Sequence, residues 1–135
     1  DGPHHFVAKA ALRHLDRWVR DGTPPPEAPR IEIDDGPSIV RDDNGIAVGG
    51  VRTPVVDAPV EALSGDPGPE PSVVCLLMGS TLPIPQDRLA EMFPSRELYL
   101  EKFEAAADEA IAAGFVLEED RDALLATAKP ELLGA

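Results

Sequence analysis

The hydrophobic positions near the start of the chain follow the period of a helix. Between Phe6 and Asp21 the apolar residues form one stripe, opposite a charged side: Ala8, Ala11, Leu12, Leu15, Trp18 and Val19. Spacing of this kind predicts an amphipathic helix with one buried face. Gly22 suits the left-handed position just after a helix, and the prolines at 24–26 cannot continue it. We therefore expect one long N-terminal helix.

The pattern changes between Asp21 and Pro85, where proline is too frequent for long helices. Short β-prone runs occur at Ile31–Ile33, Ile39–Arg41, Ile46–Val48, Val55–Val56 and Val73–Leu77. Asn44 and Gly45 separate two of these runs and predict a tight hairpin, since both turn residues can adopt positive φ. Gly49 and Gly50 predict a bulge or a close backbone approach after the hairpin. The whole stretch is expected to form a small, irregular antiparallel sheet.

Two further segments lack strand patterning. Ser64–Ser72 contains no residue that could pack in a core, so it is expected to be an exposed, mobile loop. Gly79–Thr81 follows the last β-prone run and is expected to end that strand and enter a turn.

Helical spacing returns after Pro85. A short helix is expected over Pro85–Phe93, and Pro94 would stop it. Ser95 is placed to cap a longer helix over Arg96–Ala113. The apolar residues of the longer helix again share one face: Leu100, Phe103, Ala107, Ala110 and Ile111. Gly114 is a natural residue to follow its end.

A last helix is expected over Glu118–Ala128, packed through Leu124 and Leu125 and ended by Pro130. It would pair with the longer helix as an αα-hairpin. The predicted fold class is therefore α+β: an N-terminal amphipathic helix, a small antiparallel sheet and a C-terminal helical pair. The corresponding segments are residues 1–22, 23–84 and 85–135.

Composition narrows the choice of partners. The chain has 135 residues, with 25 acidic and 12 basic ones, and a net charge of −13. A field of this sign opposes binding to phosphate backbones and to anionic membranes, so no nucleic-acid partner is expected. No apolar run approaches the roughly 18 residues of a membrane span. The single cysteine, Cys75, excludes an internal disulfide and a Cys-rich zinc site.

The histidines are the first candidates for chemistry. His4 or His5 could act as a general base at the start of a helix, as acyl-transfer enzymes require. Both are also placed to be exposed side chains near the terminus, or one of them could pack against the helix. His14, between Arg13 and Leu15, is expected to be a surface or boundary residue of the first helix.

The acidic clusters Asp34–Asp35 and Asp42–Asn44 invite a calcium interpretation. With Gly45 as the loop glycine, however, Val40 and Val51 would stand at the first and last ligand positions, and neither can bind calcium. We expect these acids to form turns and to carry solvated charge.

Ser80 and Cys75 are the candidate nucleophiles. A nucleophile elbow needs glycine two residues before and two residues after the serine, but Met78 and Leu82 stand there. Cys75 lies within an apolar run, where a thiol is expected to be buried and inert. Neither a Gly-x-Gly-x-x-Gly motif nor a Walker-type loop is present. The sequence therefore predicts no catalytic, cofactor-binding or metal-binding residue and no cofactor.

Longer sequence phrases show a resemblance. They are Asp1–Pro25, Gly49–Val60, Cys75–Pro83, Phe93–Ser95 and Tyr99–Gly114. The first resembles the closing helix of a poorly characterised family of α/β-hydrolase-domain proteins, and the others resemble the C-terminal extension of that family. The resemblance covers essentially the whole chain, although none of its phrases is catalytic.

The resemblance implies a function for a longer protein. Family members are several times longer and would carry the nucleophilic serine and its acid partner upstream of this chain. The catalytic histidine would also lie upstream of Asp1, with His4 and His5 left open as alternatives. The chain would then be the non-catalytic C-terminal part of a serine-hydrolase-like protein that cleaves a carboxylic ester or a similar acyl bond. It would complete the fold against an upstream hydrolase core and could line the substrate pocket.

The alternative is an independent, non-catalytic binding or dimerisation domain that self-associates or binds a partner through the first helix. An independent domain predicts that Leu12, Leu15 and Trp18 are buried within the chain's own residues. The hydrolase interpretation predicts that they are open to solvent when the core is not present.

Overall fold

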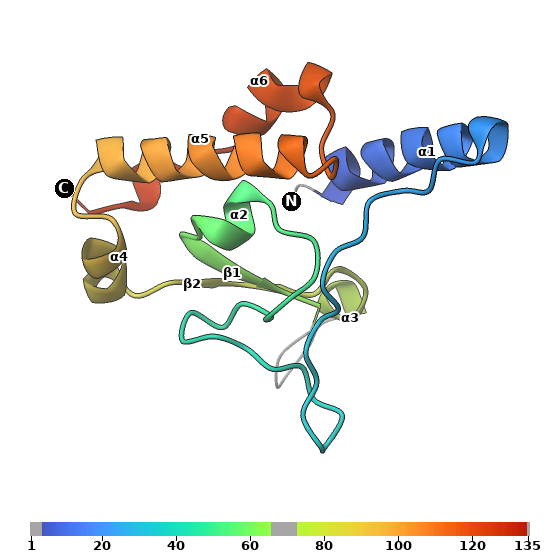
Figure 1. Cartoon of the computed structure of the whole chain (residues 1–135). Helices are drawn as coiled ribbons and strands as arrows, with labels where there is room; N and C mark the ends of the chain where they lie inside the picture. Colours follow the sequence, from blue (N-terminus) through green and yellow to red (C-terminus); the bar gives the residue numbers. More distant parts are fainter. Residues whose placement is uncertain (1–3, 66–72, 135) are drawn as a thin grey trace.

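The computed structural model describes residues 4–65 and 73–134 (Figure 1). Its elements are, in chain order, α1 (His4–Asp21), α2 (Pro54–Asp57), β1 (Glu61–Ser64), α3 (Val73–Met78), β2 (Ser80–Pro83), α4 (Gln86–Met92), α5 (Arg96–Ala112), the 3₁₀ turn η1 (Glu118–Asp120), α6 (Arg121–Leu125) and the 3₁₀ turn η2 (Pro130–Leu132). Helices and one antiparallel pair of strands confirm the α+β class. Residues 66–72 of the predicted loop lie outside the described residues.

The helix α1 forms where the pattern predicts it, but it begins two residues earlier, at His4. Gly22 follows its end with φ of 76°, and the Gly22 amide donates a hydrogen bond of 2.9 Å to the Trp18 carbonyl. This left-handed glycine terminates α1 as predicted. Figure 1 shows α1 (blue) extending away from the body, beyond the C-terminal end of α5.

Ion pairs with Glu119 and Asp120, near the end of the chain, attach the first half of α1 to the rest of the protein. Lys9 Nζ lies 2.7 Å from Asp120 Oδ1 and 3.2 Å from Glu119 Oε1. Arg13 donates two hydrogen bonds to the same Glu119 carboxylate, of 3.0 and 3.1 Å. Asp120 is itself buried, and its second oxygen has no hydrogen-bond partner among the described residues. These ion pairs hold α1 on η1.

The apolar stripe of α1 is not buried. Phe6 and Ala10, at the fastened end, are covered by the rest of the chain. The larger stripe residues are open to solvent: Leu12 is 67%, Leu15 50%, Trp18 51% and Val19 79% exposed. The prediction that an independent domain buries Leu12, Leu15 and Trp18 within its own residues is therefore wrong. The reason is geometric: Phe6 and Ala10 lie on the side of the helix opposite the stripe, and the rest of the chain packs against that side. Ala8 and Ala11 are therefore exposed even near the start of α1.

Replacing Trp18 with alanine is expected to lower the unfolding free energy by less than about 1 kcal/mol. A half-exposed side chain loses far less than the roughly 3–5 kcal/mol typical of a buried tryptophan. Chemical denaturation followed by far-ultraviolet circular dichroism measures this difference. A loss above about 3 kcal/mol would mean that Trp18 is covered in solution.

The sheet differs from the predicted one. β1 and β2 pair antiparallel, with Leu63 opposite Thr81 and Ser64 opposite Ser80. Neither strand was expected, and Gly79–Thr81 enters a strand instead of ending one. Val55–Val56 lies in α2, because Pro54 stands at the first helical position, where its missing N–H costs nothing.

Val73–Leu77 is helical, within α3, so the prediction of a strand there is also wrong. A short apolar run carries no period that separates a buried strand from a helix. Cys75 lies on α3, and its side chain lies outside the described part of the chain, so the prediction of a buried thiol is untested.

The predicted hairpin is present as isolated backbone pairings. Arg41 pairs with Ala47, and the Gly45 amide donates a hydrogen bond of 2.9 Å to the Asp42 carbonyl. Gly45 has φ of 78°, whereas Asn44 does not have a positive φ. The turn is therefore a type I turn followed by a left-handed glycine, and not the expected turn with two positive φ angles. A second bridge joins Ile33 to Ile39.

The C-terminal helices mostly follow the prediction. Ser95 accepts a hydrogen bond of 3.2 Å from the Leu98 amide, so it caps α5, and Gly114 follows α5 with φ of 81°. The last helix is shorter than expected, because residues 118–120 form a 3₁₀ turn before α6. Pro130 begins the turn η2 and does not simply end a helix.

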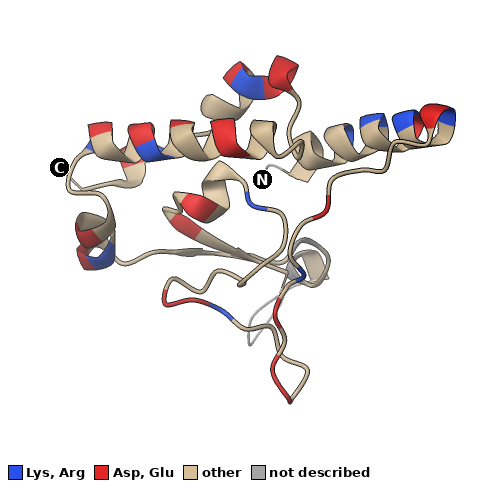
Figure 2. Ribbon diagram, viewed as in Figure 1, with Lys and Arg blue, Asp and Glu red and all other residues tan. Residues whose placement is uncertain are grey.

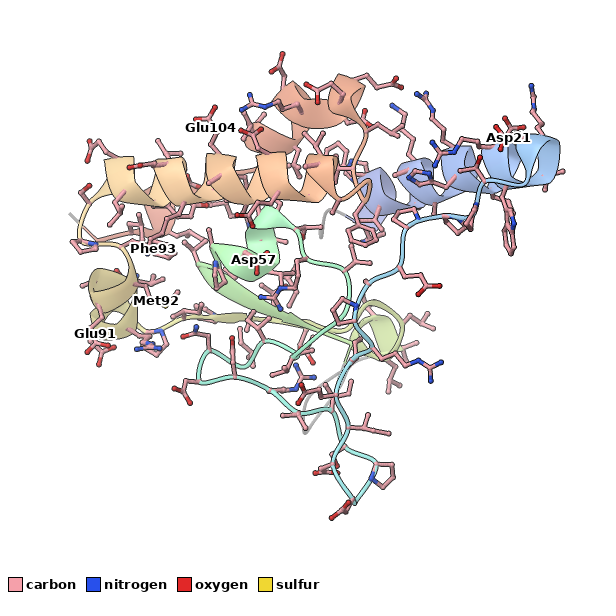
Figure 3. The ribbon with its side chains drawn as sticks, in the orientation of Figure 1. Asp21, Asp57, Glu91, Met92, Phe93 and Glu104 are labelled. Atoms are coloured by element: carbon pink, nitrogen blue, oxygen red, sulfur yellow. The ribbon has the colours of Figure 1, made fainter. Side chains whose placement is uncertain are left out.

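Two groups of buried residues form the core of the described chain, and they follow one another along a single face of α5. The first joins α4, α5 and the sheet through Ala58, Val60, Ile84, Leu89, Phe93, Tyr99, Phe103 and Leu133. The second joins α1, α5 and α6 through Phe6, Ala107, Ala110, Val116 and Leu124. Figure 3 shows Phe93 beneath α5 and Glu104 on the opposite side of that helix. Leu100, predicted to share the packed face, is instead 43% exposed.

Charge is distributed unevenly over these elements. Figure 2 shows Lys and Arg gathered along the outer half of α1, while Asp and Glu are spread over α5, α6 and the loops. Arg121 binds Asp108 at 2.6 Å and Glu104 at 2.7 Å, which ties α6 to the outer face of α5. The arginine holds the pKa of the Asp108 carboxyl below its usual range.

Candidate functional site

The two-stranded sheet separates two cavities. Side chains of a strand alternate between its faces, so Glu61, Leu63 and the paired Thr81 face one way. These three line a cavity of about 440 Å³, here called the α5 cavity. Ala62 and Ser64 line a second cavity of about 930 Å³ on the other face. The short sheet thus forms a wall of both cavities.

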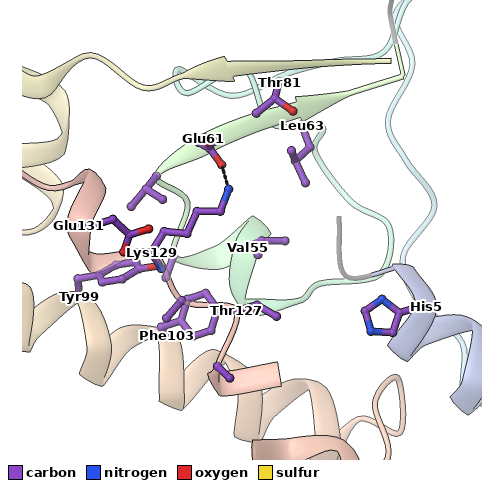
Figure 4. A pocket seen from close by; sticks show the side chains of 14 residues that line it. His5, Val55, Glu61, Leu63, Thr81, Tyr99, Phe103, Thr127, Lys129 and Glu131 are labelled. Atoms are coloured by element: carbon purple, nitrogen blue, oxygen red, sulfur yellow. Dashed lines mark hydrogen bonds and ion pairs between the residues drawn. The ribbon is translucent and has the colours of Figure 1, made fainter. Parts of the chain in front are cut away.

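The α5 cavity has a largely apolar wall. Val55 from α2, Ala58 just after α2, Val60 before β1 and Phe103 from α5 contribute to it. Figure 4 shows these elements surrounding the cavity, with His5 on α1 at the far side. A volume of several hundred Å³ with apolar walls and a few polar groups is typical of small-molecule sites.

The polar groups of the cavity gather at one end. Lys129 and Glu61 form an ion pair across it, drawn in Figure 4. The Lys129 backbone amide donates a hydrogen bond of 3.0 Å to the Tyr99 hydroxyl. Glu131 lines the same end, and Thr127 is also part of the wall. The polar end is therefore built by β1, α5 and the segment that follows α6.

Burial raises the pKa of the Tyr99 hydroxyl above its usual range, although the hydrogen bond from Lys129 opposes the shift. The nearby carboxylates of Glu131 and Glu61 raise it further. The phenol therefore stays neutral at physiological pH. It serves the cavity as a hydrogen-bonding group and not as a charge.

The stability of the chain is expected to fall in alkaline solution as Tyr99 ionises. Because the native pKa of Tyr99 is raised, its contribution is complete below the unfolded value of about 10 and is lost as the pH rises through the native value. Tyr99 is the only tyrosine, so the ultraviolet absorbance of tyrosinate reports it alone. The native chain should titrate at higher pH than the denatured chain. Identical titrations would contradict the burial of this hydroxyl, and Tyr99→Phe should remove the signal.

The histidines take separate roles. His5 is exposed and lines the α5 cavity, with its ring centroid 3.9 Å from that of Phe6. His4 is exposed and does not line the cavity. His14 Nε2 lies 2.7 Å from the Gly114 carbonyl oxygen, and its Nδ1 lies 3.1 Å from the Arg17 guanidinium. A neutral ring with its proton on Nε2 satisfies both partners. His14 therefore links α1 to the end of α5 as a boundary residue, as the sequence predicts.

The acidic clusters form turns, in agreement with the prediction. One Asp34 oxygen accepts hydrogen bonds from the Gly36 and Ser38 amides, at 2.8 and 2.9 Å. One Asp42 oxygen accepts from the Asn44 and Ile46 amides, both at 2.9 Å. Within residues 4–65 and 73–134, no three His, Cys, Asp or Glu side chains gather in a way that could hold a metal ion.

Two arginines, Arg41 and Arg88, line the second cavity, and both donate hydrogen bonds to other groups of the protein. Arg41 donates to the Gly45 carbonyl at 2.9 Å and to the Ser64 hydroxyl at 3.1 Å. Arg88 donates to the Asn44 side chain at 3.1 Å. These bonds connect the hairpin to β1 and α4. Ser80 lines this cavity as well, on the face opposite His5 and the α5 cavity.

Sequence reasoning missed the residues of the polar end. Glu61 and Lys129 are 68 residues apart, and Tyr99 and Lys129 are 30 apart. No local spacing connects such residues, so the fold alone brings them together. Of the described histidine, serine and acidic side chains that the sequence offered as candidates for chemistry, only His5 lines the α5 cavity.

The comparisons with known proteins agree with the resemblance. Residues 1–126 match the family described as alpha/beta hydrolase domain. The chain belongs to this family. No curated protein and no solved structure matches it. In the part of the chain that the structure describes, every helix is too short or too polar to cross a lipid bilayer.

Proposed function

We propose that the chain is the non-catalytic C-terminal portion of a serine-hydrolase-like protein that cleaves a carboxylic ester or a similar acyl bond. In this proposal residues 1–22 are the closing helix of the hydrolase core, residues 23–84 are an extension, and residues 85–135 are a helical segment. The nucleophile, its acid partner and the catalytic histidine belong to the upstream core. The chain completes the fold and contributes one wall of the substrate pocket.

The α5 cavity is the observation that carries the proposal. An apolar wall made by Val55, Ala58 and Phe103 suits an acyl chain, and the polar end around Lys129 gives a bound molecule an orientation. A cavity of this kind in a chain of the alpha/beta hydrolase domain family supports a role in substrate binding.

The exposed stripe of α1 supports the closing-helix part of the proposal. Leu12, Leu15 and Trp18 lie open to solvent on one helix. A contiguous apolar face of this kind usually marks a contact surface. In the proposal the upstream hydrolase core covers it.

The test compares this chain with the product of the complete open reading frame that contains it. The chain alone should not turn over p-nitrophenyl esters and should bind the dye ANS through α1, whereas the longer product should hydrolyse the esters and bind less dye. Saturable esterase activity of the chain alone would contradict the proposal. So would an inactive longer product, or a dimer of the chain that shields Trp18 from quenchers and abolishes dye binding.

A matched pair of variants in the longer product tests the pocket wall. Val55→Phe fills the α5 cavity and should raise KM for long acyl chains more than for acetyl esters, since less room remains for the chain. Leu100→Phe adds a ring on an exposed part of α5 and should leave the preference unchanged. Equal effects of the two variants on KM would show that the α5 cavity is not part of the substrate site.

A further inference from the structure

The charged groups of the α5 cavity do not cancel. Glu61 and Glu131 supply two carboxylates to its polar end, and Lys129 supplies one ammonium group. Tyr99 stays neutral there. His5 is the other titratable group on the wall, and Figure 4 shows it on α1, across the cavity from Lys129 and Glu131. The polar end therefore carries one net negative charge.

The two carboxylates at the polar end differ in their burial and in their partners. Lys129 binds Glu61, whose side chain is only 23% exposed, so this carboxylate is partly desolvated. Glu131 is exposed, and Figure 4 shows it beside Lys129 and Tyr99. A partly desolvated charge interacts more strongly with a ligand charge than a fully solvated one does. The sign of the polar end thus selects the ligand.

We infer that the α5 cavity binds a molecule with an apolar chain or ring that ends in an ammonium group, with the ammonium between Glu61 and Glu131 and the apolar part against Val55, Ala58 and Phe103. As a statement about substrate, this inference rests on the proposed function, and it adds the chemical class of the acyl-bearing molecule. As a statement about binding, it concerns this chain alone.

In this arrangement the Lys129 ammonium competes with the ligand ammonium for the Glu61 carboxylate. Lys129 already neutralises part of the Glu61 charge, and a ligand ammonium shares that carboxylate with it. A ligand carboxylate would instead face Glu61 and Glu131, and would have to draw Lys129 away from Glu61. Like charges brought close together in a partly buried site repel strongly. The cavity therefore discriminates against fatty carboxylates.

The experiment uses the 135-residue chain and three probes of equal length: hexylamine, 1-hexanol and hexanoate. Two-dimensional NMR follows the Lys129 amide and the Tyr99 ring, which lie at the polar end. Hexylamine should bind at least about tenfold more tightly than hexanoate, with hexanol between them. Equal affinities, or no shift at Lys129 and Tyr99 with any probe, would overturn the inference.

Three substitutions fix the origin of the preference. Glu61→Gln should reduce the amine-to-carboxylate preference severalfold, and Lys129→Gln should strengthen hexylamine binding because it removes the competitor. Glu101→Gln changes the net charge by the same unit at an exposed position of α5 that does not line the cavity, and should change nothing. An equal effect of Glu101→Gln and Glu61→Gln would assign the preference to the overall charge and overturn the inference. Weaker amine binding in Lys129→Gln would also overturn it.

The two proposals can fail separately. Binding to the chain alone is measured without any ester turnover, so a negative NMR result beside an active longer product refutes the ligand class and leaves the hydrolase function standing. Tight amine binding to the chain, together with an inactive longer product, would support the ligand class and refute the hydrolase function. Circular dichroism of each variant confirms that it is folded.

Discussion

Replacing Phe103 with alanine is expected to lower the unfolding free energy by about 3–5 kcal/mol. Phe103 is only 2% exposed, and its ring centroid lies 5.7 Å from that of Tyr99 in the core group that joins α5 to the sheet. The substitution removes a large apolar surface and leaves a hole that α5 cannot close. Chemical denaturation followed by circular dichroism measures the change.

Leu100 is the matched control for Phe103, because it lies one turn earlier on α5 and is 43% exposed. Leu100→Ala should cost less than about 1 kcal/mol, as surface truncations usually do. If both substitutions cost the same, α5 does not pack on the sheet through the Phe103 side.

Replacing Gly49 with alanine is expected to cost about 2–4 kcal/mol, from backbone strain and a displaced neighbouring segment. Gly49 has φ of 83°, and a β-carbon there would stand 2.2 Å from the Arg30 carbonyl oxygen. The new atom would push the Arg30 segment away and break the adjacent hydrogen bonds from Glu32 to Val48 and from Gly50 to Pro29. Hydrogen exchange of the Glu32 and Gly50 amides should accelerate together.

Gly22→Ala separates strain from collision. Gly22 has a similar φ of 76°, but no atom of the described residues outside its chain neighbours lies within 4 Å of the position of its β-carbon. Only the left-handed penalty of about 1–2 kcal/mol should remain. An effect of Gly49→Ala no larger than that of Gly22→Ala would show that the Arg30 segment does not approach Gly49 in solution.

The sequence predicted well the features that rest on short-range chemistry. Ser95 caps α5 because its hydroxyl reaches an amide three residues on, and Gly22 and Gly114 follow helices because glycine adopts positive φ without strain. The hairpin was also located correctly, since Asn44 and Gly45, which predicted it, lie within its turn. Such signals lie within four residues of the structure that they specify.

The sheet could not be predicted because its strands carry little strand character. β1 reads Glu61–Ser64, with no β-branched residue, and it is a strand because it pairs with β2. Val73–Leu77 has strong strand character, yet it forms the helix α3. Tertiary pairing therefore outweighed local preference in β1, whereas in α3 the strand preference of the residues did not decide the structure.

The candidate site was harder still to predict. A periodic stripe marks α1 as amphipathic but cannot state whether a covering surface lies in the same 135 residues, and all six residues of the stripe are open to solvent. The polar end of the α5 cavity depends on Glu61 meeting Lys129 across the fold. The cavity therefore emerged only with the three-dimensional arrangement.

The fastening of α1 has a consequence for the order of events during synthesis. Its partners for Lys9, Arg13 and His14 stand 111, 106 and 100 residues later in the chain. At about 5–20 residues per second, the ribosome needs on the order of 5–20 s to deliver them. Throughout that interval Phe6 and Ala10, which the later residues bury in the folded chain, stay exposed on the nascent helix. Chaperone capture of the emerging polypeptide, and its sensitivity to translation speed, should therefore concentrate on α1.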